Sequence, residues 1–284
     1  MSVLINGKEL ADKLQEQTKR EVRELEKQKI RPGLVVLIVG DNPASQIYVK
    51  NKSLAAERIG IYSKEQHYSA DITEDELIKE IQIFNQNDDF HGILVQLPLP
   101  EHINADRVLL EINPIKDVDG FHPMNLGRLL AGVPHTIPCT PYGIMKMFEA
   151  YNIDLTGKRA VILGRSNIVG KPMGILMLAK DATVTYAHSK TENLIEVCRE
   201  ADILVVAIGQ GHFVTKEFIK PGAVVIDVGM NRNESGKLIG DVKFDEVEPL
   251  TSYITPVPRG VGPMTITMLM QQTVEACRRQ KFGE

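Results

Sequence analysis

The sequence is poor in cysteine, and its few cysteines follow no pattern. The 284 residues include three of them, Cys139, Cys198 and Cys277. Their wide and uneven spacing excludes a CxxC-type metal motif and a framework of paired disulfides. An odd number of scattered thiols is typical of a reducing compartment, so we expect a cytoplasmic protein.

Long apolar runs and a surplus of one charge are also missing. No apolar stretch approaches the ~20 residues of a membrane helix, and the beginning, MSVLINGKEL, lacks the features of a signal peptide. Lysine and arginine number 33 against 37 aspartates and glutamates, which gives a net charge of -4. We therefore expect neither nucleic acid nor a membrane as a partner.

Patterns of metal ligands and of nucleophiles are absent as well. The seven histidines form neither an HxxxH nor an HExxH motif, and we expect no metal ion. The sequence has no GxSxG motif and no cysteine–histidine arrangement typical of a nucleophile. It gives no reason to expect either chemistry.

The sequence does contain the alternation typical of an α/β protein. Hydrophobic residues make up 43% of it, and its length is sufficient for two hydrophobic cores. Short apolar runs alternate with amphipathic segments, which predicts parallel sheets with crossover helices. Strands are predicted at 34–39, 92–97, 159–163, 183–187, 203–208 and 223–228. Helices are predicted at 10–29, 45–59, 73–85, 140–151, 172–179 and 264–280. A capping box is predicted at Thr73 and Glu76, and residues 106–138 are expected to be rich in loops.

A glycine-rich loop follows the predicted strand 159–163 and precedes a helix and another strand. This setting favours a loop whose backbone N–H groups hold the pyrophosphate of a dinucleotide at a helix N-terminus. Ser166 replaces the second glycine of the GxGxxG pattern, so the motif alone is weak, and a structural turn is the alternative. The candidate contacts in the loop are Gly164, Arg165, Ser166, Val169 and Gly170.

The next strand indicates which dinucleotide is bound. NAD enzymes usually place a carboxylate ~20 residues after the loop to bind the ribose hydroxyls. Here the strand ends in His188-Ser-Lys-Thr191, without a carboxylate. Arg165, Ser189 and Lys190 would attract a 2′-phosphate. We expect NADP, with His188 and Ser189 as further contacts, although solvated surface charges or NAD binding without a carboxylate remain alternatives.

These patterns predict two α/β domains with the active-site cleft between them. Residues 140–263 are expected to form a Rossmann-type NAD(P)-binding domain. The last helix is expected to return to the first domain, which would then comprise residues 1–139 and 264–284.

The first half of the chain offers several candidate catalytic residues. Tyr48 and Lys52 are four positions apart on a predicted helix and so share one face. A lysine packed against an aromatic ring and apolar side chains can act as a neutral general base, but a surface lysine beside a half-buried tyrosine is the commoner explanation. Gln96 ends a predicted strand, where its amide could hold a lysine or a substrate carbonyl.

Two acids alternate in the segment Lys116-Asp-Val-Asp-Gly-Phe121. Asp117 and Asp119 could bind a metal, although other ligands are not evident, or could form an Asp-Gly turn. A carboxylate could also accept two parallel N–H bonds from an aminopyrimidine. The residues alone leave these alternatives open.

Taken together, these motifs resemble those of the bifunctional methylenetetrahydrofolate dehydrogenase/methenyltetrahydrofolate cyclohydrolase family. The matching segments run in family order through about residues 45–270. They are Tyr48-Val-Lys-Asn-Lys52, Val95-Gln-Leu-Pro-Leu-Pro100, Lys116-Asp-Val-Asp-Gly-Phe121, Pro138-Cys-Thr-Pro141, Gly164-Arg-Ser-Asn-Ile-Val-Gly-Lys-Pro172, His188-Ser-Lys-Thr191 and Gly262-Pro-Met-Thr265.

The resemblance implies a role for individual residues. Lys52 matches the catalytic lysine, Tyr48 the tyrosine that packs on the folate ring system, and Gln96 the glutamine that positions the lysine. Asp119 matches the acid that binds the aminopyrimidine edge of the pterin. Further substrate contacts are implied at Leu97, Gly262, Pro263 and Thr265.

The resemblance also implies two sequential reactions and a homodimer formed through the cofactor domain. 5,10-Methylenetetrahydrofolate would give a hydride to NADP⁺, and water would open the resulting 5,10-methenyl cation to 10-formyltetrahydrofolate. Arg259 departs from the family, which usually has a glycine there. Its side chain could crowd the pocket, bind the glutamate tail or bind a cofactor phosphate.

Other functions remain open at this point. The chain could retain only one of the two activities, or could be another NADP oxidoreductase of the shikimate-dehydrogenase type. A nucleotide-sensing protein without enzymatic activity is a further alternative. Oxidation of a hydroxy acid would support the second possibility, and tight NADP binding without turnover of any folate would support the third.

Overall fold

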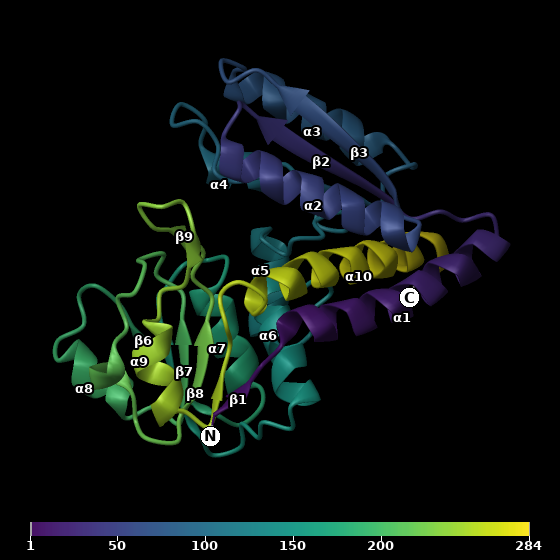
Figure 1. Cartoon of the computed structure of the whole chain (residues 1–284). Coiled ribbons are helices and arrows are strands. Elements are labelled where there is room, and N and C mark those ends of the chain that lie inside the picture. Colours follow the sequence, from purple (N-terminus) through teal and green to yellow (C-terminus); the bar gives the residue numbers. More distant parts are fainter. Residues whose placement is uncertain (1, 284) are drawn as a thin grey trace. The chain divides into compact units, whose positions relative to one another are not determined.

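The computed structural model describes residues 2–283, which divide into two compact units (Figure 1). One unit comprises the residues up to Asp12 together with Thr140–Thr265, and we call it the six-strand unit. The other comprises Lys13–Cys139 and the residues from Ile266, and we call it the three-strand unit. Each has a parallel sheet of its own, as the alternation of strands and helices predicted.

The six-strand unit is built on a parallel sheet with the strand order β1-β11-β8-β7-β5-β6. Its strands are β1 (Val3–Leu4), β5 (Arg159–Leu163), β6 (Thr183–Ala187), β7 (Ile203–Val206), β8 (Val224–Asp227) and β11 (Tyr253–Ile254). A hairpin of β9 (Asn231–Arg232) and β10 (Leu238–Ile239) follows β8. The central strands β7 and β8 are buried throughout, which is typical of a parallel sheet covered on both faces.

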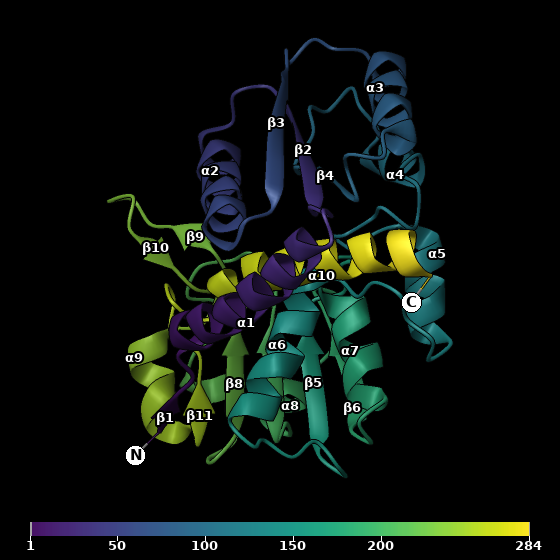
Figure 2. The same ribbon diagram turned by 90° about the vertical axis from the view of Figure 1, so that its right-hand side faces the viewer.

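The helices of this unit are α6 (Cys139–Ala150), α7 (Gly170–Leu178), α8 (Leu194–Arg199) and α9 (Phe244–Val247), with the short 3₁₀ turns η1 (Lys216–Phe218) and η2 (Glu248–Leu250). Helix α6 precedes β5, and the other helices and turns of this unit lie between its later strands. Helix α7 packs against β5 and β6, the two strands that it connects (Figure 2). This is the strand–helix–strand unit that the glycine-rich loop predicted.

The three-strand unit has a parallel sheet with the order β3-β2-β4. Its strands are β2 (Gly33–Val39), β3 (Tyr62–Tyr68) and β4 (Gly92–Val95). Its helices are α2 (Pro43–Ile59), α3 (Glu74–Gln86), α4 (Ala105–Leu110) and α5 (Pro123–Leu130). Apolar side chains of β2 and β4 pack with those of α3 in one core, because β2 and β4 are buried along their whole length.

Two long helices, α1 (Gly7–Lys27) and α10 (Val261–Phe282), contribute residues to both units. The first turns of each belong to the six-strand unit and the remainder to the three-strand unit. Inside the three-strand unit the two helices are joined by the buried hydrogen bond from Gln15 to Thr267. Among residues 2–283, no helix has both the length and the apolar composition of a membrane span.

Most predicted elements are confirmed, some with shifted ends. The capping box is present, since Thr73 accepts a hydrogen bond from the backbone N–H of Glu76 and the Glu76 carboxylate accepts one from that of Thr73. Residues 106–138 lie mostly in loops, as predicted, but the short helices α4 and α5 within this range were missed. Both helices are short, and each begins at a side-chain cap, Asn104 and His122 respectively, which a search for long amphipathic periods does not detect.

Strand β3 was missed and the N-terminus belongs to a different unit from the one expected. The sequence of β3, YSKEQHY, is polar because it is an edge strand without a fully buried residue. Residues up to Asp12 lie with the six-strand unit, because β1 pairs with β11 through Val3 and Leu4. A two-residue strand has too little periodicity to be recognised in the sequence.

Candidate functional site

The amine of Lys52 lies in a buried position in the three-strand unit. Lys52 belongs to α2 and is 8% exposed, whereas lysines are seldom buried without a partner. Its Nζ donates a hydrogen bond to Oε1 of Gln96 at 3.0 Å. Gln96 follows β4 directly, and its backbone N–H donates to the carbonyl of Leu37. The strand end therefore holds the amide in place for the lysine.

The orientation of the Gln96 amide is set by its other end. Its Nε2 donates to the carbonyl oxygen of Leu97 at 2.6 Å. The amide oxygen, which is an acceptor only, thus faces the amine of Lys52. The structure brings Lys52, Gln96 and Leu97 together at the carboxyl end of β4, the edge at which parallel sheets bind ligands.

Helix α2 places its other candidate residue as the spacing predicted. Tyr48 lies one turn before Lys52 on the same helical face and is half-buried. Lys50, between them in sequence, is exposed. The two lysines therefore differ in environment although only one residue separates them.

The two alternating acids have different environments. Asp117 is buried and its carboxylate accepts hydrogen bonds from the backbone N–H groups of Gly120, Phe121 and His122. A further bond comes from the amide of Asn125 at 2.8 Å. These donors occupy both carboxylate oxygens. Asp117 therefore stabilises the turn that the Asp-Gly sequence suggested.

Asp119 instead faces the charged and polar groups of the site. Burial raises the pKa of its carboxyl above the ordinary value, and the positive charge of Lys52 offsets part of that rise. A hydrogen bond with the Cys139 thiol also lowers this pKa. The residue nevertheless keeps some exposed surface. Asp119 is thus the acid of the pair that is placed to meet a ligand beside Lys52.

Cys139 and Gln272 complete this group of side chains. The fully buried thiol of Cys139 donates to the carbonyl of Val118 and accepts from Nε2 of Gln272, each at 3.3 Å. Gln272 also bonds both backbone groups of Ile137. Burial raises the pKa of the thiol well above its usual range, so it stays protonated at neutral pH. Gln272 was missed because a polar residue inside a long helix is usually solvated.

The described part of the chain contains no metal-binding cluster. Within residues 2–283, no three His, Cys, Asp or Glu side chains converge in a way that would hold an ion. The buried bonds of Asp117 leave it unsuited to act as a metal ligand together with Asp119.

In the six-strand unit two positions of the glycine loop have no room for a side chain. Gly164 has φ +124°, and a Cβ on it would come within 2.3 Å of the carbonyl oxygen of Ala207. A Cβ on Gly170 would come within 2.3 Å of the carbonyl oxygen of Gly164. The loop therefore folds tightly onto the ends of β5 and β7, and side chains are excluded there.

Ser166 has a structural role at the position of the missing second glycine. Its Oγ accepts hydrogen bonds from the backbone N–H groups of Val169 and Gly170 at 3.2 and 3.4 Å. Its carbonyl accepts one from Lys171. The hydroxyl thus organises the first turn of α7, where the positive end of the helix dipole favours an anion.

The polar side chains expected to contact a 2′-phosphate lie on the surface. Arg165, Ser189 and Lys190 are all exposed. His188 is half-buried, and its Nδ1 accepts from the N–H of Lys190 while its own N–H donates to Thr191. No carboxylate follows β6 in this turn. The tight glycines, the helix N-terminus and the exposed cations fit a phosphate-bearing dinucleotide.

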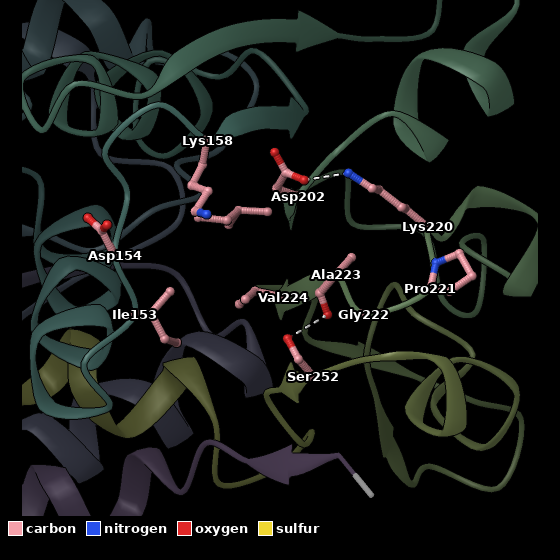
Figure 3. A pocket seen from close by; sticks show the side chains of 11 residues that line it. Ile153, Asp154, Lys158, Asp202, Lys220, Pro221, Gly222, Ala223, Val224 and Ser252 are labelled. Carbon is pink, nitrogen blue, oxygen red and sulfur yellow. Dashed lines mark hydrogen bonds and ion pairs between the residues drawn. The ribbon is translucent and has the colours of Figure 1, made fainter.

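The strand order identifies the edge at which such a ligand is held. The chain leaves β5 for β6 on one side and returns to β7 on the other, and ligands of open α/β sheets bind at such a switch point, beyond the carboxyl ends. A cavity of about 260 Å³ lies at the opposite, amino edge (Figure 3). Its Asp202 is bonded to Lys220 and to the N–H of Arg159, so this cavity does not compete as the dinucleotide site.

The remaining candidates lie around the start of α10, also in the six-strand unit. Thr265 and Thr140 share a hydrogen bond of 2.9 Å between their hydroxyls, while Gly262 and Pro263 are partly exposed in the first turn. Arg259 has φ +79°, a conformation that favours glycine. Its side chain is exposed and lines a shallow depression around the start of α1, together with Asn6, Lys8, Glu9 and Asp12.

The chain matches known proteins over nearly its whole length. Residues 5–119 match the model for the catalytic domain of tetrahydrofolate dehydrogenase/cyclohydrolase, and residues 138–281 match the model for its NAD(P)-binding domain. The bifunctional protein FolD of Enterococcus faecalis is 70% identical, covering 99% of this chain and 100% of its own. That of Streptococcus thermophilus is 60% identical over the full length of both.

Solved structures agree as well. The bifunctional FolD enzyme of Campylobacter jejuni has a TM-score of 0.97 and 49% identity, covering 99% of this chain and 100% of its own. The Trypanosoma brucei enzyme, solved with NADP and an inhibitor, has a TM-score of 0.95 and 38% identity, covering 98% of each chain. Together with the two α/β units and their motifs, these matches show that the chain belongs to the tetrahydrofolate dehydrogenase/cyclohydrolase family.

Proposed function

We propose that the protein oxidises 5,10-methylenetetrahydrofolate to the 5,10-methenyl form with NADP⁺ and hydrolyses that product to 10-formyltetrahydrofolate. The observation that carries this proposal is the buried contact of Lys52 with Gln96 beside Asp119. It occurs in a chain whose other unit has the glycine loop of a dinucleotide site. The relatives named above are described as bifunctional.

In this proposal Asp119 binds the substrate. Its carboxylate accepts two parallel N–H bonds from the aminopyrimidine edge of the pterin, a geometry that carboxylates favour. The Cys139 thiol and the turn held by Asp117 keep that carboxylate in place. Tyr48, on the same face of α2 as Lys52, packs on the ring system, and the backbone around Leu97 borders it.

Lys52 serves both steps through its amine. NADP⁺, when bound, accepts the hydride. A positively charged lysine would repel the developing methenyl cation, so the proposal requires that the Lys52 amine, which is cationic where it lowers the pKa of Asp119, gives its proton to solvent before the hydride leaves. In the second step the Lys52 amine takes a proton from the attacking water, while the Gln96 carbonyl oxygen fixes one N–H of the amine. Gln96 thereby directs the nitrogen lone pair toward the water.

The six-strand unit would hold the cofactor through groups of its own. The first turn of α7 and the loop from Gly164 would receive the pyrophosphate, and Arg165 with Ser189 would receive the 2′-phosphate. Replacement of Ser189 by aspartate introduces a charge that repels this phosphate. Ser189→Asp is expected to raise the KM for NADP⁺ at least tenfold, which is about the effect of losing one charge-assisted hydrogen bond to the phosphate. Cyclohydrolase activity is expected to be unchanged.

Two spectrophotometric assays test the function directly. Methylenetetrahydrofolate is offered with NADP⁺ or with NAD⁺, and methenyltetrahydrofolate is offered without cofactor. Turnover in both assays, with a clear preference for NADP⁺, is expected. Turnover in one assay alone would reduce the proposal to a single activity, and oxidation of shikimate-type hydroxy acids instead would overturn it.

We also infer that the enzyme is a cytoplasmic homodimer joined through the six-strand unit. Strand β6 is at the edge of the sheet, where unpaired backbone groups favour association. Tyr186 on β6 and Leu178 on α7 are 40% and 62% exposed. Light scattering should give twice the chain mass, and Tyr186→Arg should shift it toward the monomer. Free, buried Cys139, Cys198 and Cys277 agree with a reducing compartment.

A further inference from the structure

A fully buried carboxylate, Asp241, lies at the carboxyl edge of the sheet in the six-strand unit. It is 0% exposed, and it follows the β9–β10 hairpin. Its Oδ2 accepts hydrogen bonds from the backbone N–H groups of Ile208 and Gly209 at 2.8 and 3.0 Å. Its Oδ1 accepts one from Nδ2 of Asn231 at 2.8 Å. The charge is therefore matched by three donors from two different segments.

The two N–H groups that Asp241 binds belong to the loop that follows β7. This loop begins at Ala207, whose carbonyl oxygen lies where a Cβ on Gly164 would clash. The loop after β7 and the glycine loop after β5 are therefore in contact, on the two sides of the switch point. Movement of Ile208 and Gly209 would alter the backbone that borders the glycine loop.

A second buried carboxylate holds Asp241 itself. Asp227, the last residue of β8 and 4% exposed, accepts hydrogen bonds from the N–H groups of Asp241 and Val242 at 2.9 and 3.0 Å. It also accepts one from Gly229. A Cβ on Gly240 would come within 1.8 Å of the Asp227 carboxylate, and one on Gly229 within 2.4 Å of that of Asp241. The chain is thus shaped closely around both carboxylates.

Burial of a carboxylate such as Asp227 or Asp241 is unfavourable unless hydrogen bonds compensate for the lost hydration. Burial raises the pKa of Asp227 to about 7, although its three backbone donors act in the opposite direction. Aliphatic side chains would fill this interior without such a penalty. What a carboxylate supplies here, and an aliphatic group cannot, is two acceptor oxygens for backbone N–H groups of separate loops.

We propose that Asp241 is a positioning residue of the dinucleotide site, which holds the loop after β7 against the glycine loop through the N–H groups of Ile208 and Gly209. The proposal rests on the proposed binding of NADP by this unit. Asp241 acts through the backbone and has no direct contact with the reacting atoms. Its removal releases the loop and widens the range of positions open to the phosphate-binding backbone.

The test measures NADP binding and loop mobility separately. Asp241→Ala is expected to raise the Kd for NADPH, followed by fluorescence, about tenfold or more, since it removes two charge-assisted bonds. Hydrogen–deuterium exchange of the 207–211 peptide should become faster. Cyclohydrolase turnover of methenyltetrahydrofolate, which uses no cofactor, should persist. Asp241→Asn keeps one carbonyl oxygen for the loop, so it should fold and change the Kd only about threefold.

Two matched controls separate positioning from general stability. Thr255→Val removes the buried bond from the N–H of Asp227 to the threonine hydroxyl without touching the loop after β7. Asp245→Asn changes an exposed acid near Asp241. Both should leave the Kd and the exchange of 207–211 unchanged.

Three results would overturn the inference. The first is a folded Asp241→Ala protein with an unaltered Kd. The second is an equal rise in Kd for Thr255→Val. The third applies if Asp241→Ala does not fold, and it is an Asp241→Asn protein whose 207–211 exchange becomes faster while its Kd for NADPH stays unaltered. If the unaltered protein itself fails to bind NADPH, the proposed function fails, and this inference with it.

Discussion

The two units prepare their candidate sites in different ways. In the three-strand unit the important groups are side chains that are buried and bonded to one another, as Lys52 is to Gln96. In the six-strand unit the important groups are backbone atoms shaped by Gly164 and Gly170, while Arg165 and Ser189 are exposed. Buried side chains suit proton transfer, and exposed cations beside a helix N-terminus suit a soluble polyanion.

This difference implies that the two functions can be removed independently. A change at a buried side chain of the three-strand unit should abolish chemistry and spare nucleotide binding. A change in the backbone of the six-strand unit should do the reverse. The following predictions, from the largest expected effect to the smallest, test that separation.

Replacement of Lys52 by methionine should have the largest effect. Loss of a general base should lower the cyclohydrolase rate by ~10²–10⁴, and the dehydrogenase rate should fall less, because hydride transfer depends more on positioning. NADPH binding, measured by fluorescence, should be retained. Lys50→Met, at an exposed position of the same helix, is the matched control. Undiminished cyclohydrolase activity in Lys52→Met would exclude the mechanism.

Replacement of Gly164 by alanine should show the opposite pattern. Its new Cβ would lie 2.3 Å from the Ala207 carbonyl oxygen, which should destabilise the fold by about 1–3 kcal/mol and weaken NADPH binding strongly. Cyclohydrolase activity should remain. Gly157→Ala, which also has a positive φ but no atom within 4 Å of the new Cβ, is the control. Equal melting temperatures for the two variants would contradict this account.

The three-strand unit should also contribute a distinct dependence of stability on pH. Burial lowers the pKa of His91 from 6.5 to about 4, and its Nε2 has no hydrogen-bond partner among residues 2–283. Between these values the unfolded chain binds a proton that the folded chain does not. Protonation of His91 therefore does not change the free energy of unfolding above pH 6.5. As the pH falls from 6.5 toward 4, it lowers the free energy of unfolding by up to roughly 3 kcal/mol.

Thermal melts of His91→Gln across this pH range measure that contribution. The variant cannot take up the proton, so its melting temperature should decline less steeply toward pH 4 than that of the unaltered chain. His102→Gln, at an exposed histidine, should leave the slope unchanged. Parallel curves for the His91 variant and the unaltered protein would show that the histidine is not responsible.

Arg259→Gly should have the smallest effect. Glycine adopts the φ of +79° without strain, so we expect a gain in stability below about 1 kcal/mol. The side chain lines the depression beside α1, so both KM values should stay within about twofold in the same steady-state assays. A large rise in the KM for NADP⁺ would instead indicate a phosphate contact, and a faster rate would indicate crowding.

Much of the candidate site follows from local sequence. The spacing of Tyr48 and Lys52, the position of Gln96 at a strand end and the glycines around Ser166 depend on contacts within a few residues. Helical and strand periods determine them directly. For the same reason the ends of β5 and β6 coincide with their predicted bounds. The predicted cleft between the domains and the catalytic roles of these residues stay predictions.

The sequence by itself determined the alternation of strands and helices, the dinucleotide loop and the helical face that carries Lys52. Only the tertiary structure decided that Asp117 forms the turn while Asp119 faces Lys52. It also decided that Asp241 holds the loop after β7. The donors to Asp117 lie within eight residues of it in the sequence, but the burial of Asp117 and the place of Asp119 near Lys52 depend on packing. The loop donors to Asp241 lie more than 30 residues away, and no local period encodes such contacts. The dinucleotide loop is set by local backbone geometry, whereas the surroundings of each acid are set by long-range packing.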